Sequence, residues 1–171
     1  MEKSIPIEDL KELALKLFET QNTWDIVKNG EVVAGYDALT KIEKTVALKI
    51  ICQDKYTEDQ IAYIRLTEDL TSGFALTVDA FCAGGEIKNA LIKYADIKKV
   101  VFDDDIDMED DEICRSFRYF LEINDEYKYE SRDVLNSDES EIYHTKEDYL
   151  FGADFKIYKA LSRFLNLVTK L

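Results

Sequence analysis

The sequence predicts an α+β protein, and three patterns of hydrophobic residues carry that prediction. Residues 5–20 and 38–51 repeat apolar side chains every three or four positions, as amphipathic helices do. Several runs between residues 60 and 123 alternate with a period of two, which is typical of β-strands. A last segment, from about Asp154 to the end, returns to the helical period. We therefore expect N-terminal helices, an antiparallel β-structure and a C-terminal helix.

The first helix has acidic residues, Glu8 and Asp9, at the end where the helix dipole is positive. After it, Asn29-Gly30 stands between two short apolar runs and predicts a β-hairpin with a two-residue turn. The second helix is expected to place its apolar residues on one face: Leu39, Ile42, Val46 and Ile50.

The strands that follow are short and spaced about ten residues apart, which favours an antiparallel sandwich or a small barrel. Gly84-Gly85 is expected to turn the chain between two of them. The run at residues 113–123 is apolar on both faces in its middle, so this strand is expected to be central or covered by a helix. The last helix is expected to bury one face: Ile157, Leu161, Phe164, Leu165, Val168 and Leu171.

Two segments resemble bacterial pleckstrin-homology-like (PH-like) domains. Residues 73–81 read GFALTVDAF and residues 91–100 read LIKYADIKKV, similar to the two strand patterns "G-F-x-L-T" and "Y-x-D-I" of such domains. The resemblance covers about residues 58–171 and implies two near-orthogonal antiparallel sheets closed by the C-terminal helix. It divides the chain into residues 1–55, a helical segment with a hairpin, and residues 56–171, a PH-like β-barrel or sandwich.

This resemblance does not select a ligand, because the fold hosts lipid, peptide and protein binding alike. Relatives that bind phosphoinositides use clusters of basic residues. The local basic group here is small, and an acidic run begins four residues after it; its members are Lys88, Lys93, Lys98 and Lys99. Binding to an anionic membrane surface is therefore the weakest of three functions that we consider.

The 171 residues suffice for one domain with a core that needs no disulfides or metals. The chain is 46% hydrophobic and 12% aromatic, so we expect a globular protein. It lacks an apolar run of about 18 residues and a leader pattern, so neither a membrane span nor a secretory signal is expected. The distant spacing of Cys52, Cys82 and Cys114 fits neither a disulfide framework nor a zinc site. We expect reduced thiols and a cytoplasmic location.

The charge is distributed unevenly. The chain has 22 basic and 36 acidic residues, a net charge of −14, which argues against a general nucleic-acid binder. Residues 103–148 hold 18 acidic and 5 basic residues, a net −13, so the rest of the chain carries a net −1. The peak is a run in which eight of ten positions are acidic: Asp103, Asp104, Asp105, Asp107, Glu109, Asp110, Asp111 and Glu112. Mutual repulsion requires such a run to be solvated or to meet a positive partner.

Three interpretations of this acidic run stay open: a solvated loop, a docking surface for a basic partner, and a divalent-cation site. An EF-hand loop beginning at Asp103 would need glycine at position 108 and glutamate at 114, where the chain has Met108 and Cys114. We therefore predict no specific metal site. Tyr127, Tyr129 and Tyr143 lie among carboxylates, and tyrosines are good interface anchors, although such residues also occur in cores and edge strands.

Catalytic groups are scarce. His144 is the only histidine and lies in an acidic stretch, so a Ser-His-Asp or Cys-His site would have to use it. The six glycines form neither a P-loop nor a G-x-G-x-x-G pattern. We predict that the protein is not an enzyme and uses no cofactor.

The sequence thus favours a noncatalytic interaction module that binds a basic protein through an acidic, tyrosine-containing surface. The alternative is an inhibitor or immunity-type protein whose carboxylates imitate nucleic-acid phosphates and neutralise a nucleic-acid-binding enzyme. The identity of the partner and the oligomeric state are not specified by these patterns.

Overall fold

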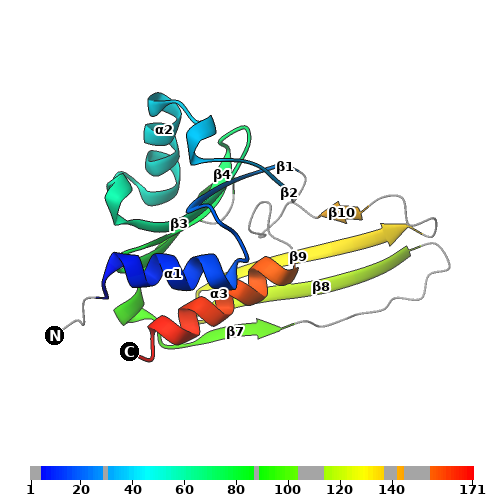
Figure 1. The fold of residues 1–171 in the computed structure, drawn as a ribbon. Helices are drawn as coiled ribbons and strands as arrows, with labels where there is room; N and C mark the ends of the chain where they lie inside the picture. The colour runs from blue at the N-terminus through cyan, green and yellow to red at the C-terminus, as the bar shows by residue number, and fades with distance from the viewer. Residues whose placement is uncertain (1–4, 29–30, 87–88, 104–113, 137–141, 145–154) are drawn as a thin grey trace.

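The α+β class is confirmed by a computed structural model of the chain, which contains three α-helices and two sheets (Figure 1). It describes residues 5–28, 31–86, 89–103, 114–136, 142–144 and 155–171. Within these ranges, only the backbone is described for residues 114–119, 130–136, 142–144 and 155.

The larger sheet has six strands in the order β2-β1-β3-β4-β5-β6. β1 and β2 pair antiparallel on either side of residues 29–30, which confirms the predicted hairpin. β1 also pairs with β3, and this pairing is parallel, whereas the other neighbours are antiparallel. Strands from both sides of residue 55 therefore share one sheet. The bounds are β1 Trp24–Lys28, β2 Glu31–Gly35, β3 Ile61–Thr67, β4 Ser72–Thr77, β5 Ala80–Gly85 and β6 Ala90–Lys93.

The smaller sheet has four strands in the antiparallel order β10-β9-β8-β7. β8 and β9 pair along their full ten-residue lengths and extend well beyond the helices (Figure 1). The described strands thus form two separate sheets and not one closed barrel. The bounds are β7 Val100–Asp103, β8 Cys114–Ile123, β9 Tyr127–Asn136 and β10 Ile142–His144.

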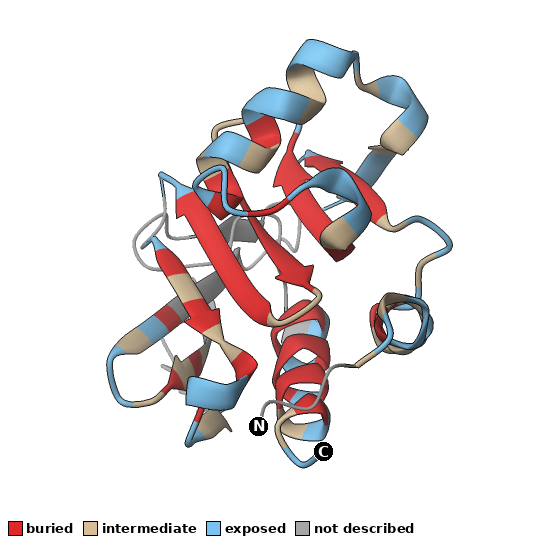
Figure 2. Cartoon of the chain, turned by 90° about the vertical axis from the view of Figure 1, so that its left-hand side faces the viewer, coloured by how far each residue is buried: buried red, intermediate tan, exposed pale blue. Residues whose placement is uncertain are grey.

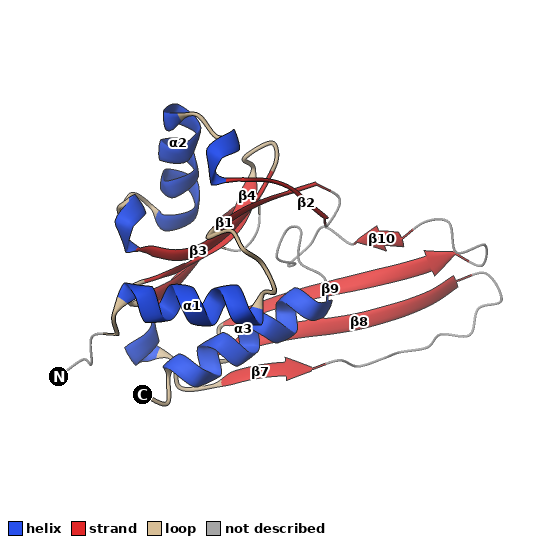
Figure 3. Cartoon of the chain, in the orientation of Figure 1, coloured by secondary structure: helices blue, strands red, loops and turns tan. Residues whose placement is uncertain are grey.

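Helices α1 (Ile7–Leu17) and α3 (Phe155–Val168) lie between the two sheets (Figure 3). α1 packs on β3, α3 packs on β7 and β8, and the two helices touch each other. Figure 2 shows α3 as largely buried. This arrangement produces the main core, which joins both helices to both sheets and includes Leu10, Ala14, Tyr63, Phe74, Phe81, Leu121, Ile123, Tyr129, Tyr158, Leu161, Phe164 and Leu165.

Helix α2 (Lys41–Cys52) covers the opposite face of the six-stranded sheet. It begins with a capping box in which Thr40 accepts a hydrogen bond from the Glu43 N–H and Glu43 accepts one from the Thr40 N–H. Beneath it lies a second core formed by Trp24, Ile26, Ala47, Ile51, Cys52, Tyr56, Ile61, Ile64, Leu66, Ala75, Ala80 and Cys82.

Of the four apolar residues expected on one face of this helix, Leu39 and Ile50 pack partly buried against the second core, but the other two do not. Ile42 is 76% exposed and Val46 is 38% exposed, whereas Ala47 and Ile51 are buried. The reason is the close approach of the helix to the sheet. A Cβ atom on Gly84 of β5 would lie 2.2 Å from the carbonyl oxygen of Ile50. The helix backbone therefore lies close to the strands, and the side of the helix that carries the small residue Ala47 faces them.

Candidate functional site

The acidic run predicted as the partner surface begins at the end of β7. Asp103 is exposed and lies opposite Phe120 of β8 in the sheet. The other acidic residues of the run lie outside the described residues: Asp104, Asp105, Asp107, Glu109, Asp110, Asp111 and Glu112.

The predicted surface tyrosines occupy different environments. Tyr129 is 0% exposed and packs edge to face on Phe81, with ring centroids 6.1 Å apart. Burial raises the pKa of its hydroxyl well above the ordinary value. The prediction that Tyr129 contributes to an exposed surface is therefore corrected, because the face of β9 that carries it covers the core. Tyr127 is half-buried against that core, and Tyr143 lies opposite Val134 where β10 pairs with β9.

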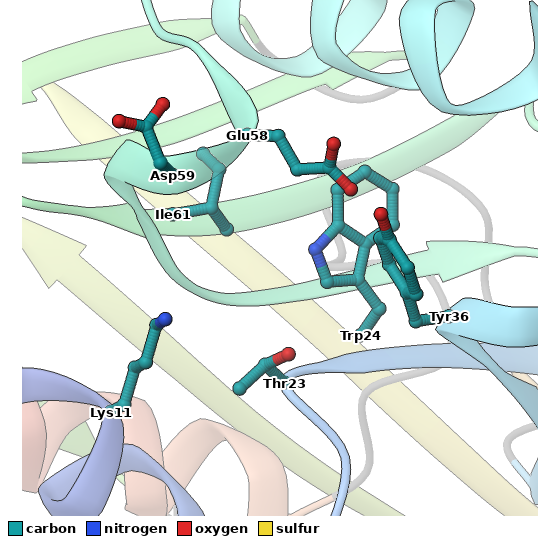
Figure 4. Close-up of a pocket in the computed structure, with 7 residues that line it drawn as sticks. All are labelled: Lys11, Thr23, Trp24, Tyr36, Glu58, Asp59 and Ile61. Carbon is teal, nitrogen blue, oxygen red and sulfur yellow. The ribbon is translucent and has the colours of Figure 1, made fainter. Parts of the chain in front are cut away.

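A pocket of about 410 Å³ lies at one side of the six-stranded sheet (Figure 4). Its lining comes from α1, the start of β1, two short 3-10 helices and β3; these 3-10 helices span Tyr36–Ala38 and Glu58–Gln60. The lining residues are Lys11, Thr23, Trp24, Tyr36, Glu58, Asp59 and Ile61.

Two aromatic rings form one wall of this pocket. Trp24 is only 2% exposed and meets Tyr36 edge to face, with ring centroids 5.6 Å apart and planes at 79°. The ammonium group of Lys44 lies 3.4 Å from the centroid of the Tyr36 ring, a cation-π contact that helps to hold this ring in place.

Two exposed carboxylates lie at the pocket, both from the second 3-10 helix. The hydroxyl of Thr57 donates a hydrogen bond to Asp59, and this bond lowers the pKa of the Asp59 carboxyl, with a smaller contribution from the charge of Lys11. The Lys11 ammonium lies 3.5 Å from a carboxylate oxygen of Glu8. Of the charged side chains that line the pocket, two are therefore acidic and one is basic.

A buried polar network lies on the other face of the same sheet. Asp25 is 1% exposed and accepts hydrogen bonds from the hydroxyls of Tyr63, at 2.7 Å, and Thr20, at 3.0 Å. Arg65, 4% exposed, is the neighbour of Asp25 in the parallel ladder. Burial raises the pKa of the Tyr63 hydroxyl well above its ordinary value, so it remains a donor. This network stabilises the junction of β1 and β3.

A second polar cluster joins the β4–β5 turn to β6. Asp79 accepts a hydrogen bond of 2.5 Å from the hydroxyl of Tyr56 and one of 2.7 Å from the ammonium of Lys93. Partial burial would raise the pKa of Asp79, but these two bonds outweigh burial and hold it below its ordinary value. The Asp79 and Lys93 side chains are 40% and 42% exposed, so the cluster lies at the surface.

The remaining candidates for chemistry do not assemble into a site within the described residues. Cys52 and Cys82 are buried free thiols; their mutual hydrogen bond, together with burial, raises the pKa of Cys82 well above its ordinary value. His144 lies in β10 opposite Asp133. No three histidine, cysteine, aspartate or glutamate side chains of the described part come close enough to hold a metal ion.

By its fold the chain is an α+β protein with two antiparallel-rich sheets, and its pocket is lined by aromatic rings and carboxylates. None of the described helices is long and apolar enough to span a membrane. The chain has no significant match among protein-family models, curated proteins or solved structures.

Sequence reasoning missed the pocket. Its residues come from segments that are far apart in the chain. Nothing in the sequence around Trp24 or Glu58 indicated that these two residues lie close together. The one signal available was that Trp24 is the single tryptophan of the chain and directly follows a short polar loop.

Proposed function

We propose that the protein is a noncatalytic interaction module that binds a basic protein partner through its acidic region. The observation that carries this proposal is the charge asymmetry: residues 103–148 have a net charge of −13, against −1 for the remainder. Such a field accelerates association with a positive partner and disfavours acidic ones.

The structure supports this proposal at the point where the acidic run starts. Asp103 is exposed at the end of β7 and pairs with β8, so the first residue of the run lies at the surface of the smaller sheet. Because like charges close together destabilise a compact state, a cationic partner would relieve their repulsion.

The PH-like assignment of residues 56–171 remains part of this proposal, as does a cytoplasmic location. The assignment is supported by two antiparallel-rich sheets and by a C-terminal helix that packs on the smaller of them. The parallel β1–β3 pair, which adds an N-terminal hairpin to the larger sheet, is not part of what the resemblance implies.

The test is a capture experiment with lysate of the native cell at low and high salt. One variant replaces Asp103, Asp104, Asp105 and Asp107 by asparagine. A control variant removes the same charge elsewhere, at four exposed acidic residues: Glu12, Glu19, Glu31 and Asp96. We expect wild type and the control to retain a partner that mass spectrometry identifies as basic, and we expect high salt to release it.

Equal retention of this partner by the variant of the acidic run would contradict the proposal. A captured nucleic-acid-binding enzyme whose activity falls on binding would identify the basic partner as the target of an inhibitor.

A further inference from the structure

We propose that the pocket at Trp24 receives a lysine or arginine residue of the partner, binding both its cationic group and its backbone carbonyl. The inference rests on the proposed function, because it names the kind of residue that a basic partner would insert. It concerns a site separate in sequence from the acidic run.

The first observation is a buried donor without an acceptor. The Trp24 side chain is 98% buried, since only 2% is exposed, and no described residue accepts a hydrogen bond from its indole N–H. In Figure 4 the indole nitrogen lies on the side of the ring that faces the space bounded by Lys11, Thr23 and Ile61. A buried polar group without a partner is unfavourable, so this geometry suits a ligand that brings an oxygen acceptor to the nitrogen.

The second observation is an acid without a cation. Glu58 is exposed and its carboxylate lies next to the two aromatic rings in Figure 4; this carboxylate makes no hydrogen bond or ion pair with the described chain. Asp59 adds a second carboxylate, while the ammonium of Lys11 already lies 3.5 Å from Glu8. The unbalanced charge at the pocket is therefore negative, and a cationic group is favoured over an anionic one.

The third observation is apolar surface next to both groups. The apolar side chain of Ile61 and the Trp24 ring line the pocket together with the exposed carboxylates. Lysine and arginine have methylene stems that cover such surface while the charged end stays near water. A volume of about 410 Å³ is within the range of pockets that hold small ligands.

The test uses the single tryptophan of the chain as its reporter. A ¹H–¹⁵N spectrum contains one indole N–H resonance, which belongs to Trp24. The probes are the Nα-acetyl amides of lysine, arginine, norleucine and glutamate, which share the same backbone carbonyls. We expect the lysine and arginine probes to shift this resonance in a saturable way, and the norleucine and glutamate probes to leave it unchanged.

The double variant Glu58→Gln/Asp59→Asn should weaken binding of the cationic probes by about fivefold, the effect of losing exposed ion pairs. The control Glu86→Gln/Asp96→Asn removes the same charge from exposed positions that follow β5 and β6, at the other end of the strand order from β1. It should bind the probes as wild type does.

Four outcomes would overturn the inference: no shift with any probe, an equal shift with norleucine, a larger shift with glutamate, or unchanged affinity in the pocket variant. These outcomes are distinct from failure of the proposed function. If the variant of the acidic run keeps the captured partner while Glu58→Gln/Asp59→Asn loses it, the acidic-run proposal fails and the pocket inference stands.

Discussion

The hydroxyl of Tyr63 donates a 2.7 Å hydrogen bond to Oδ2 of Asp25, and both side chains are at least 99% buried. The two residues lie on neighbouring strands that run parallel, β3 and β1. The bond therefore ties the N-terminal hairpin to the remainder of the larger sheet.

Replacing Tyr63 by phenylalanine should lower the free energy of unfolding by about 1.5–3 kcal/mol, because a buried carboxylate loses a donor. Urea unfolding followed by circular dichroism measures this loss. The control Tyr36→Phe removes the same atom from a half-buried ring and should cost less than about 0.5 kcal/mol. Equal losses in the two variants would show that the Tyr63–Asp25 hydrogen bond contributes no more to the free energy of unfolding than the Tyr36 hydroxyl does.

Helix α2 carries one buried and one exposed isoleucine, Ile51 and Ile42, and their truncation should have different effects on stability. Ile51→Ala should reduce stability by about 2–5 kcal/mol, because Ile51 is 1% exposed and its truncation leaves a cavity. Ile42→Ala should change stability by less than about 0.5 kcal/mol, since this side chain is 76% exposed. Thermal unfolding of both variants compares them directly, and a larger loss for Ile42→Ala would contradict the packing of α2 through Ala47 and Ile51.

Gly84→Ala should force helix α2 away from β5. The added Cβ atom would lie 2.2 Å from the backbone oxygen of Ile50, which cannot move without shifting the helix. We expect a loss of about 1–3 kcal/mol, as for an overpacked core. At Gly35 the nearest atoms are the flexible side chain of Asn22, at 3.2 Å, so Gly35→Ala is the matched control and should be better tolerated in chemical denaturation.

The pH dependence of stability should include a contribution from Asp79. Its pKa in the folded protein is below the ordinary value, since the bonds from Lys93 and Tyr56 outweigh partial burial. The contribution is therefore fully present above the unfolded pKa of about 4 and is lost as the pH falls through the lower, folded pKa. Because the pair is partly exposed, we expect less than about 1 kcal/mol.

Asp79→Asn should lack this contribution at neutral pH and match wild type in strong acid. Urea midpoints measured between neutral pH and about pH 2, which spans the ordinary carboxyl pKa, compare the two proteins. A difference that persists unchanged in strong acid would assign the effect of the substitution to something other than ionisation of Asp79.

Patterns within single segments predicted their own elements well. Asn29-Gly30 indicated the hairpin of β1 and β2, and the period of two indicated strands between residues 60 and 123, where β3 to β8 lie. These predictions succeeded because turn chemistry and alternation act over neighbouring residues.

Features that depend on distant segments were not predicted. The parallel pairing of β1 with β3 needs α2 to cross between them, and nothing in either strand specifies it. Gly84 was expected in a turn but lies within β5, where its missing side chain accommodates the helix above. Tyr129 was placed on the surface because carboxylates lie near it in the sequence, whereas the pairing of β9 turns it toward the core.

The position of β1 also affects how safely the protein can be shortened. All seven residues of β3 are buried, and β1 occupies one of its two hydrogen-bonding edges. A chain that began at residue 56 would present that edge, with Ile64 and Leu66 beside it, to other molecules. Long apolar edge strands recruit further strands and aggregate. The N-terminal hairpin thus covers an edge through which the shortened protein would be expected to aggregate.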